Sequence, residues 1–326
     1  MGPARHNEGT RPKSVSFAAA KKVKVDYFAS AHMSAGSGAS AREGRDHEPR
    51  PFLKWAGGKS QLLEQFGPLL PRSGSYERYI EPFVGSGALF FHLRPVAAEL
   101  SDVNREIVDC YRAVKTRPQD LIRELEKHRH DERHYYDVRA KVPTKLAERA
   151  ARTIYLNKTG YNGLYRVNSR GLFNVPMGRY ENPGFQSPTL FATIRACSRA
   201  LVSARLTSGD FETALKGAGK GDFVYLDPPY VPVSETSDFT SYARGGFGWT
   251  EQERLAEVCR VLSRRGAMVM LSNSDTESVR ALYRGFRIDV VQAARSINSR
   301  GAKRGKVREV VVRNFDDVAQ VPLGPR

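Results

Sequence analysis

The fold of this chain follows from one stretch of its sequence, Phe223-Val224-Tyr225-Leu226-Asp227-Pro228-Pro229-Tyr230. Four apolar residues in a row predict a fully buried strand. The two prolines end that strand abruptly, because proline has no amide hydrogen for a neighbouring strand. An acidic and an aromatic residue flank them. In open sheets of alternating strands and helices, binding sites lie at such carboxyl ends of central strands.

Similar runs on both sides extend this pattern. Helical spacing of apolar residues over 88–93 and 251–262 alternates with short apolar runs, which predicts a mostly parallel sheet with helices on both faces. The remaining runs predict three more buried strands and a terminal hairpin, over 79–82, 97–100, 267–271, 286–293 and 307–313.

The composition limits the class of function. The chain has 326 residues and 40% hydrophobic residues, enough for a substantial core, and it has no apolar run long enough to span a membrane. Its three cysteines lie far apart without a CxxC pair, which excludes a disulfide framework and gives no zinc motif. With 52 basic and 35 acidic residues, the net charge is +17, which favours a polyanion such as nucleic acid as partner.

Two regions differ from the alternating pattern. Residues 1–50 are rich in Ala, Ser, Gly and Arg, and we expect a disordered basic tail without a secretory signal. Residues 106–189 begin with charged helical segments and continue as a loop crowded with Gly, Asn, Tyr and Arg. We interpret them as a domain inserted into a sheet domain formed by 51–105 and 190–320.

A glycine turn follows the strand predicted over 79–82. In Gly85-Ser86-Gly87 the bare backbone lets a ligand approach closely, but Phe90 stands where a dinucleotide-binding fingerprint needs its third glycine. Seventeen residues after Gly85 comes Asp102. An acid there accepts hydrogen bonds from ribose hydroxyls. Alternatively, Asp102 or Ser101 caps the following helix.

The motif Asp227-Pro228-Pro229-Tyr230 forms a rigid pair of acceptors, the Asp227 carboxylate and the Pro228 carbonyl, beside the flat ring of Tyr230. This arrangement suits a planar amino group such as N6 of adenine, whose lone pair is delocalised into the ring. Two acceptors that bind both N–H groups favour a tetrahedral nitrogen and free the lone pair for attack.

A fourth motif, Phe52-Leu53-Lys54-Trp55-Ala56-Gly57-Gly58-Lys59, opens the folded part. Gly58-Lys59-Ser60 is not a Walker A motif, because Leu53 stands where that motif needs its first glycine. Trp55 either stacks on an adenosyl or sulfonium group or belongs to the core. Lys59 is placed to bind a carboxylate of a ligand.

Together, in this order, these motifs resemble those of the Dam-type (D12 class) site-specific DNA adenine-N6 methyltransferases, over about residues 51–315. The resemblance implies a class I S-adenosylmethionine-dependent methyltransferase fold: α/β and Rossmann-like, with a mixed seven-stranded sheet and an inserted, mainly helical DNA-recognition domain. It implies methyl transfer from S-adenosyl-L-methionine to N6 of an adenine flipped out of double-stranded DNA, with GATC as the expected site and no metal.

The resemblance also implies roles for individual residues. The catalytic residues are Asp227, Pro228 and Tyr230. The cofactor contacts are Trp55, Lys59, Gly85, Gly87, Asp102, Asp210, Phe211 and Asp227. The residues that read or hold DNA are Lys54, Tyr161, Asn162, Leu164, Arg166, Pro176 and Arg179. Arginine binds guanine through two hydrogen bonds in the major groove, whereas Asn162-Gly163 also fits a plain turn.

The loop 295–308 carries six basic residues and no acidic one, a composition suited to phosphate contacts. From it we expect Arg300, Lys303 and Arg304 to bind DNA. We further expect a monomer without a membrane partner, in the cytoplasm with the nucleoid of a bacterium or phage host. Two alternatives stay open: a methyltransferase for RNA adenine or another exocyclic amine, and a DNA-binding homologue with a decayed catalytic site.

Overall fold

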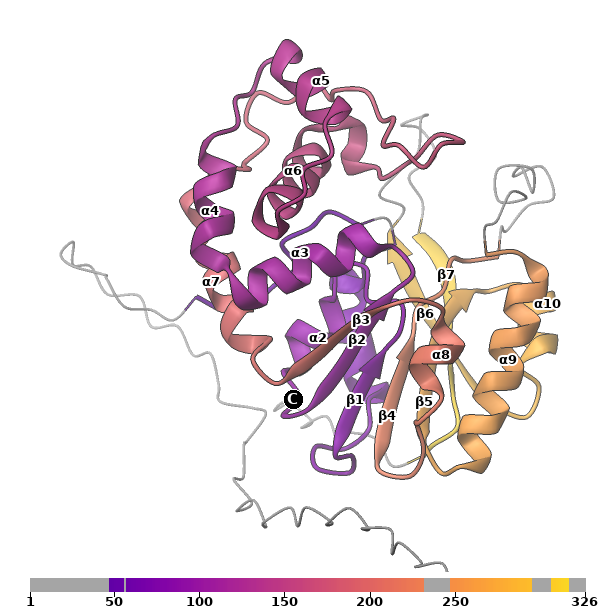
Figure 1. Cartoon of the computed structure of the whole chain (residues 1–326). Helices are drawn as coiled ribbons and strands as arrows, with labels where there is room; N and C mark the ends of the chain where they lie inside the picture. The colour runs from indigo at the N-terminus through magenta and orange to yellow at the C-terminus, as the bar shows by residue number, and fades with distance from the viewer. Residues whose placement is uncertain (1–46, 56, 232–246, 295–305, 317–326) are drawn as a thin grey trace, which may run out of the picture. The chain divides into compact units, whose positions relative to one another are not determined.

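A mixed seven-stranded sheet lies at the centre of the structure (Figure 1). The computed structural model describes residues 47–55, 57–231, 247–294 and 306–316. The strands are β1 (Arg78–Glu81), β2 (Ala98–Asp102), β3 (Ala204–Ser208), β4 (Asp222–Leu226), β5 (Met268–Ser274), β6 (Arg287–Ala294) and β7 (Lys306–Arg313). Their order is β3-β2-β1-β4-β5-β7-β6, with the first five parallel and β7 antiparallel to both neighbours. The sheet predicted from sequence, including its terminal hairpin, is confirmed.

Helices connect the strands and cover the sheet. The α-helices are α1 (Leu63–Phe66), α2 (Ala88–Leu93), α3 (Arg105–Thr116), α4 (Pro118–Glu126), α5 (Glu132–Ala140), α6 (Leu146–Thr159), α7 (Pro188–Ala200), α8 (Phe211–Leu215), α9 (Trp249–Arg264) and α10 (Glu277–Leu282), and the short 3-10 helices are η1 (Lys59–Leu62), η2 (Gly67–Leu69) and η3 (Tyr161–Gly163). Side chains of α2, α3 and α7 share a hydrophobic cluster with one face of the sheet, and those of α8, α9 and α10 with the other.

The alternating direction of side chains along each strand explains the two hydrophobic clusters, one on each face of the sheet. Successive side chains of a strand point to opposite faces. In β1, Tyr79 joins the cluster under α2 and α3, whereas Ile80 joins the cluster under α9. In β4, Tyr225 belongs to the first cluster and Val224 to the second. All of β4 is buried, as a parallel strand covered on both faces must be.

One strand was not predicted. The β3 sequence Ala-Arg-Leu-Thr-Ser buries only Ala204 fully, so it carries neither an apolar run nor a clear alternation. It lies at the edge of the sheet, where only one neighbour supplies hydrogen bonds. Sequence periodicity depends on burial, and a half-exposed edge strand shows little of it.

Helices α3 to α7 all lie between β2 and β3 in the chain. Beyond α3, a separate small cluster of buried residues joins α5 and α6 to the loop that follows them (Figure 1). Its members are Tyr135, Tyr155, Leu156, Phe173, Val175 and Phe185. This cluster gives the long Gly- and Asn-rich loop a core of its own, so its shape does not depend on the sheet alone.

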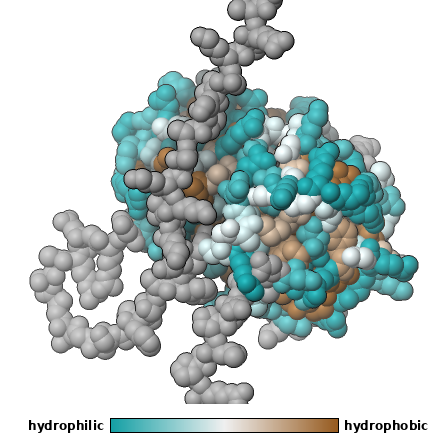
Figure 2. Space-filling model, turned by 90° about the horizontal axis from the view of Figure 1, so that it is seen from below, coloured by the Kyte–Doolittle hydropathy of each residue, from teal (hydrophilic) through white to brown (hydrophobic). Residues whose placement is uncertain are grey.

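Seen from below, the described surface is largely hydrophilic, with a hydrophobic area between the polar residues (Figure 2). No helix among the described residues has the length and the apolar character needed to cross a membrane.

Most of the predicted tail lies outside the described residues, but its last residues contact α7: His47 and Arg50 both hydrogen-bond to Thr193.

Candidate active site

The candidate active site lies where the order of the strands reverses. From β1 the chain continues to β2 and β3 on one side of the sheet, whereas β4 and β5 lie on the other. Open sheets of this kind bind ligands beyond the carboxyl ends of the strands at this point. Glu81 ends β1, and Asp227 directly follows β4. The segment Asp227-Pro228-Pro229-Tyr230 therefore lies where a binding site is expected.

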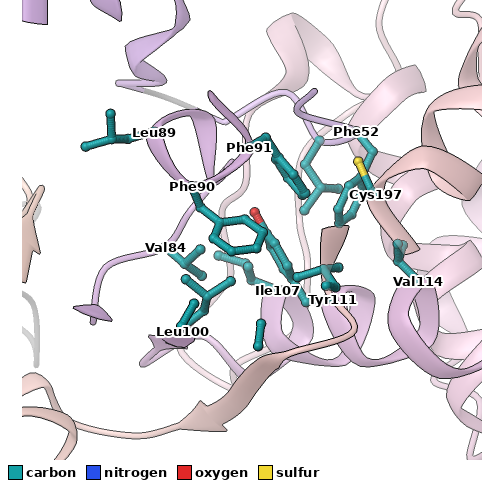
Figure 3. Packing of buried hydrophobic residues seen from close by; sticks show 14 of the residues in the cluster. Phe52, Val84, Leu89, Phe90, Phe91, Leu100, Ile107, Tyr111, Val114 and Cys197 are labelled. Atoms are coloured by element: carbon teal, nitrogen blue, oxygen red, sulfur yellow. The ribbon is translucent and has the colours of Figure 1, made fainter. Parts of the chain in front are cut away.

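The glycine turn after β1 brings bare backbone close to an indole ring. Gly85 and Gly87 have φ angles of 45° and 65°, which residues with a side chain seldom adopt. A Cβ atom on Gly85 would lie 2.9 Å from Cδ1 of Trp55. Below the turn, the Tyr111 hydroxyl donates a hydrogen bond of 3.2 Å to the Gly85 carbonyl, and Figure 3 shows Tyr111 beside Phe90 in the apolar layer. A rigid base thus supports the turn.

Asp102, the last residue of β2, binds the same turn. Its Oδ2 accepts a hydrogen bond of 3.1 Å from the Gly85 amide, and its Oδ1 accepts one of 2.8 Å from the Asn104 amide. Burial raises the pKa of Asp102 to about 6. The alternative interpretation of Asp102 or Ser101 as a helix cap is wrong, because Asn104 caps α3. The carboxylate is left at the strand end with lone pairs available for further donors.

An ion pair joins the first motif to the proline motif. Lys59 Nζ lies 2.8 Å from Asp227 Oδ1 and 4.7 Å from the centre of the Tyr230 ring. Burial raises the pKa of Asp227, and the charge of Lys59 opposes that rise. The ammonium engages one lone pair of Oδ1, and because each carboxylate oxygen has two lone pairs, the carboxylate keeps acceptor capacity. The ammonium also donates to the Gly57 carbonyl at 2.5 Å.

Glu81 is a buried carboxyl group that was not among the predicted site residues. It is 2% exposed and accepts a hydrogen bond of 2.9 Å from the Tyr79 hydroxyl. Burial raises the pKa of Glu81 well above its usual value, and the charges of Asp227 and Asp102 raise it further. Because β1 pairs in parallel with β2 and β4, Glu81 lies at the same edge of the sheet as Asp102 and Asp227. The signal for Glu81 in the sequence was an acidic residue at the end of a short apolar strand.

Glu309 of β7 is a second residue that sequence reasoning missed. Its Oε2 accepts a hydrogen bond of 2.8 Å from the Tyr230 hydroxyl. Burial raises the pKa of Glu309, and Lys59 opposes the rise. The Tyr230 ring is therefore held at its hydroxyl end by Glu309, with the Lys59 ammonium over its face. In the sequence, Glu309 is a single acidic residue in a strand rich in valine, and nothing near it points to Tyr230. The two residues meet because β7 lies beside β5, the neighbour of β4.

Asp210 and Phe211, the two predicted cofactor contacts after β3, already have partners within the protein. Asp210 is the N-cap of α8, where it accepts a hydrogen bond of 3.0 Å from the Glu212 amide, and it also pairs with Arg254. Phe211 is 4% exposed, and its ring centre lies 5.4 Å from that of Phe83. The two residues therefore build the α8 end of the site, and their contact with a cofactor stays a prediction.

Six of the predicted DNA-binding residues lie on one hairpin-like loop after α6: Tyr161, Asn162, Leu164, Arg166, Pro176 and Arg179. Tyr161 donates its amide hydrogen to the Pro176 carbonyl at 2.9 Å, which pairs the two arms. Further along, the exposed Arg166 donates through Nε to Asn174 Oδ1 at 2.9 Å. Asn162 has a φ of 53° and is exposed, so the turn interpretation of Asn162-Gly163 describes its backbone, while its side chain is free to meet a ligand.

Asn157, at the end of α6, connects this loop to the first motif. Its side-chain amide accepts from the Lys54 amide at 2.8 Å and donates to the carbonyls of Lys54 at 2.6 Å and Gly163 at 3.1 Å. Asn157 is 2% exposed. Lys54 itself is exposed, and its ammonium lies 4.7 Å from the centre of the Tyr180 ring. Trp55 lies 5.3 Å, between ring centres, from Tyr165 of the loop.

The other predicted DNA contacts have different outcomes. Leu164 packs against the small cluster under the loop, and Arg179 is exposed. Arg300, Lys303 and Arg304 lie outside the described residues. Arg308, the last residue of the loop 295–308, pairs with Asp275 at 2.8 Å, where β7 runs beside β5.

Comparison with known proteins shows the family of the chain. Residues 55–297 match the family model of the D12 class N6 adenine-specific DNA methyltransferases. The chain is 43% identical over 274 residues to the Type II methyltransferase M1.LlaDCHI of Lactococcus lactis subsp. cremoris, covering 82% of this chain and 95% of that protein. It is 41% identical over 291 residues to the Type II methyltransferase M.MjaIII of Methanocaldococcus jannaschii, covering 82% of this chain and 100% of that one. It is 36% identical over 269 residues to the DNA adenine methylase of Vibrio cholerae, covering 80% and 95%.

Proposed function

The chain belongs to the D12 class of N6 adenine-specific DNA methyltransferases, and we propose that it methylates an adenine rotated out of duplex DNA, with S-adenosyl-L-methionine as methyl donor. The class I methyltransferase fold and the enzymatic activity follow from this membership. The proposal concerns the donor, the residues that act, the base flipping and the GATC target.

The residues at the strand ends fit the proposed cofactor. The bare backbone at Gly85 packs against the Trp55 indole, because a Cβ atom there would lie only 2.9 Å from it, so glycine allows the proposed contacts Gly85 and Trp55 to lie side by side. Asp102 is placed for ribose hydroxyls, as acids at this strand end are in related sheets. Trp55, Lys59, Gly87, Asp210 and Phe211 complete the proposed contacts. Bound there, S-adenosyl-L-methionine supplies a methyl group activated by its sulfonium charge.

One observation carries the proposed chemistry: a carboxylate oxygen of Asp227 with spare acceptor capacity beside a proline carbonyl at the strand reversal. The Asp227 carboxylate and the Pro228 carbonyl accept the two hydrogens of the adenine amino group, and Tyr230 lies under the base. These acceptors stabilise the positive charge that develops on N6 during the transfer, and they orient its lone pair. Lys59 keeps Asp227 ionised for this purpose.

Support for a DNA target comes from the loop after α6. Arg166 uses Nε and one terminal nitrogen to bind Asn174, at 2.9 and 3.4 Å, so that its remaining donors are presented from a fixed position. Such an arginine suits the O6 and N7 atoms of guanine. We propose Tyr161, Asn162, Leu164, Pro176, Arg179 and Lys54 as its neighbours in the reading of GATC, and residues 106–189 as the recognition domain. Rotation of the base costs a few kcal/mol, which these contacts offset.

The test is methylation of matched oligonucleotides by the purified chain. We expect N6-methyladenine in a GATC duplex, identified by mass spectrometry, and none in a duplex with the site scrambled. Asp227→Ala should abolish the transfer while DNA affinity stays within about threefold, because the acceptor acts on the flipped base alone. Modification of ribosomal RNA in preference to DNA would establish the RNA alternative, and cofactor binding without any product would establish a decayed site.

The cellular setting is also proposed. We propose that the enzyme acts as a monomer on the DNA of a bacterial or phage nucleoid in the cytoplasm. Relatives are named both as type II methyltransferases and as DNA adenine methylases, so restriction–modification and control of DNA replication are the two roles to compare. Methylome sequencing of a host that expresses the chain identifies the target site directly.

A further inference from the structure

Two buried carboxamides hold the segment that follows the proline motif. Gln252 of α9 is 2% exposed and Asn273 of β5 is fully buried. Gln252 Nε2 donates to the Pro229 carbonyl at 2.8 Å, and Asn273 Nδ2 donates to Gln252 Oε1 at 3.0 Å. Asn273 Oδ1 accepts from the amide of Val231 at 3.3 Å. The two side chains therefore form a continuous relay from α9 through β5 to the segment 229–231.

Ser274 completes the relay on the side of β5. Its hydroxyl donates to the Val231 carbonyl at 2.6 Å, and its amide donates to Asn273 Oδ1 at 2.8 Å. Buried amides without partners cost about 1–3 kcal/mol each, so a fully bonded network of this kind holds one arrangement. The peptide groups on both sides of Tyr230 are thus oriented by side chains that come from other parts of the sequence.

The relay also determines which carbonyl remains available. The carbonyls of Pro229 and Val231 are both occupied. In the described part of the chain, no donor binds the carbonyl of Pro228. Because φ is set by the ring at both prolines, fixing the groups after Pro229 leaves Pro228 little freedom. Among the described residues its carbonyl therefore has no partner, and yet it is held in place.

We propose that Gln252 and Asn273 are positioning residues for methyl transfer, which orient the Pro228 carbonyl toward the target amino group by engaging the segment behind it. The inference rests on the proposed function and adds two residues to it. Neither side chain is assigned contact with substrate or cofactor. Their effect is on geometry, and a displacement of a reacting group by about 1 Å costs on the order of 100-fold in rate.

The test compares two carboxamide side chains, the buried Gln252 of α9 and the half-buried Asn314 directly after β7. Gln252→Met keeps the volume and removes the donor to Pro229. Asn314→Leu is the matched control, because Asn314 also binds β5, accepting from the Val269 amide at 2.8 Å and donating to the Ala267 carbonyl at 2.8 Å, at the other end of that strand. Melting temperature, affinities for S-adenosyl-L-methionine and DNA, and the single-turnover rate of methylation are measured for both.

We expect Gln252→Met to lower the single-turnover rate by about 10- to 100-fold while both affinities stay within about threefold. Asn314→Leu should lower the melting temperature by a similar amount and leave the rate within about threefold of wild type. Equal rate losses in the two variants, or a rate of Gln252→Met within threefold of wild type, would overturn the inference. If Gln252→Met does not fold, Asn273→Asp makes the same test, because it keeps the acceptor for Val231 and loses the donor to Gln252.

A conservative variant separates positioning from general stability. In Gln252→Glu, the protonated carboxyl donates to the Pro229 carbonyl and the ionised form does not. Its rate relative to wild type should therefore rise as the pH falls, at temperatures where both proteins are folded. A ratio independent of pH would count against the relay. Failure of the wild type itself to methylate adenine would instead refute the proposed function, so the two failures are distinguishable.

Discussion

Replacement of Lys59 by methionine tests whether its ammonium keeps Asp227 ionised. The two charged groups lie 2.8 Å apart, and their side chains are only 5% and 19% exposed. Burial raises the pKa of Asp227 and the lysine charge opposes the rise. Methionine keeps most of the length of the lysine side chain but removes its charge, so Asp227 loses this nearby cation.

The magnitude follows from the distance. At 2.8 Å, with the effective dielectric constant of about 20 that fits charge pairs near a protein surface, Coulomb's law gives an attraction of about 6 kcal/mol. This attraction favours the ionised form of Asp227, so loss of the ammonium raises the pKa of Asp227 further. A carboxyl group with a raised pKa takes up its proton at higher pH. The variant therefore loses its ionised acceptor at a pH where the wild type still has it.

The assay is the single-turnover rate of methylation at saturating cofactor and DNA, measured from about pH 6 to about pH 9.5. We expect the acidic limb of the Lys59→Met profile to lie at higher pH than that of the wild type, with the two rates converging at high pH. Lys115→Met is the control, because Lys115 of α3 donates to the Ala204 carbonyl of β3, outside the site. If the limbs of Lys59→Met and wild type coincide, Lys59 does not govern the ionisation of Asp227.

Three further predictions concern the cofactor and DNA contacts. Burial raises the pKa of Asp102 to about 6. Because the ionised carboxylate is the acceptor for the cofactor, the affinity for S-adenosyl-L-methionine should rise as the pH increases through that value. Calorimetric titrations in which Asp102→Asn shows the same pH dependence as the wild type would contradict this prediction. Gly85→Ala should weaken cofactor binding by about tenfold or more. The added Cβ would lie 2.9 Å from Trp55 and push the indole away, and the φ of 45° at this position disfavours alanine. Unchanged affinity in the same titration would refute the close approach of Gly85 and Trp55. Arg166→Ala should relax the preference for GATC over single-base variants by about 1–3 kcal/mol, with nonspecific affinity changed less, and an unaltered preference in competition assays would exclude Arg166 as a base reader.

Local sequence predicted the parts of the site that depend on neighbours along the chain. The strand before Asp227 is apolar throughout and the glycines after β1 mark a turn, so the ends of β1 and β4 could be placed in advance. The pairing of Lys59 with Asp227 required the fold, since 168 positions separate them and no periodicity connects them. The same holds for Glu309, which reaches Tyr230 only because β7 lies beside β5.

Polar residues inside the core were the hardest to interpret from sequence. Gln252 occurs in a charged helical segment, where it reads as a surface residue, yet it is 2% exposed. Asn273 lies between two serines at the end of an apolar strand and looks like the beginning of a loop. Each is buried because its partner is supplied by another element. Hydrogen-bond partners distant in sequence leave no local pattern, so such residues become visible only in the assembled structure.

Under the proposed function, the side-chain amide of Asn157 connects binding of the methyl donor with reading of the target site. Its three hydrogen bonds join Lys54, next to Trp55, to Gly163 in the loop after α6. A movement of that loop on DNA binding would therefore be passed on to Trp55. Linkage requires that the effect be equal in both directions: whatever free energy DNA adds to cofactor affinity, the cofactor adds to DNA affinity. We propose that this amide couples the affinity for the target site to the affinity for the methyl donor.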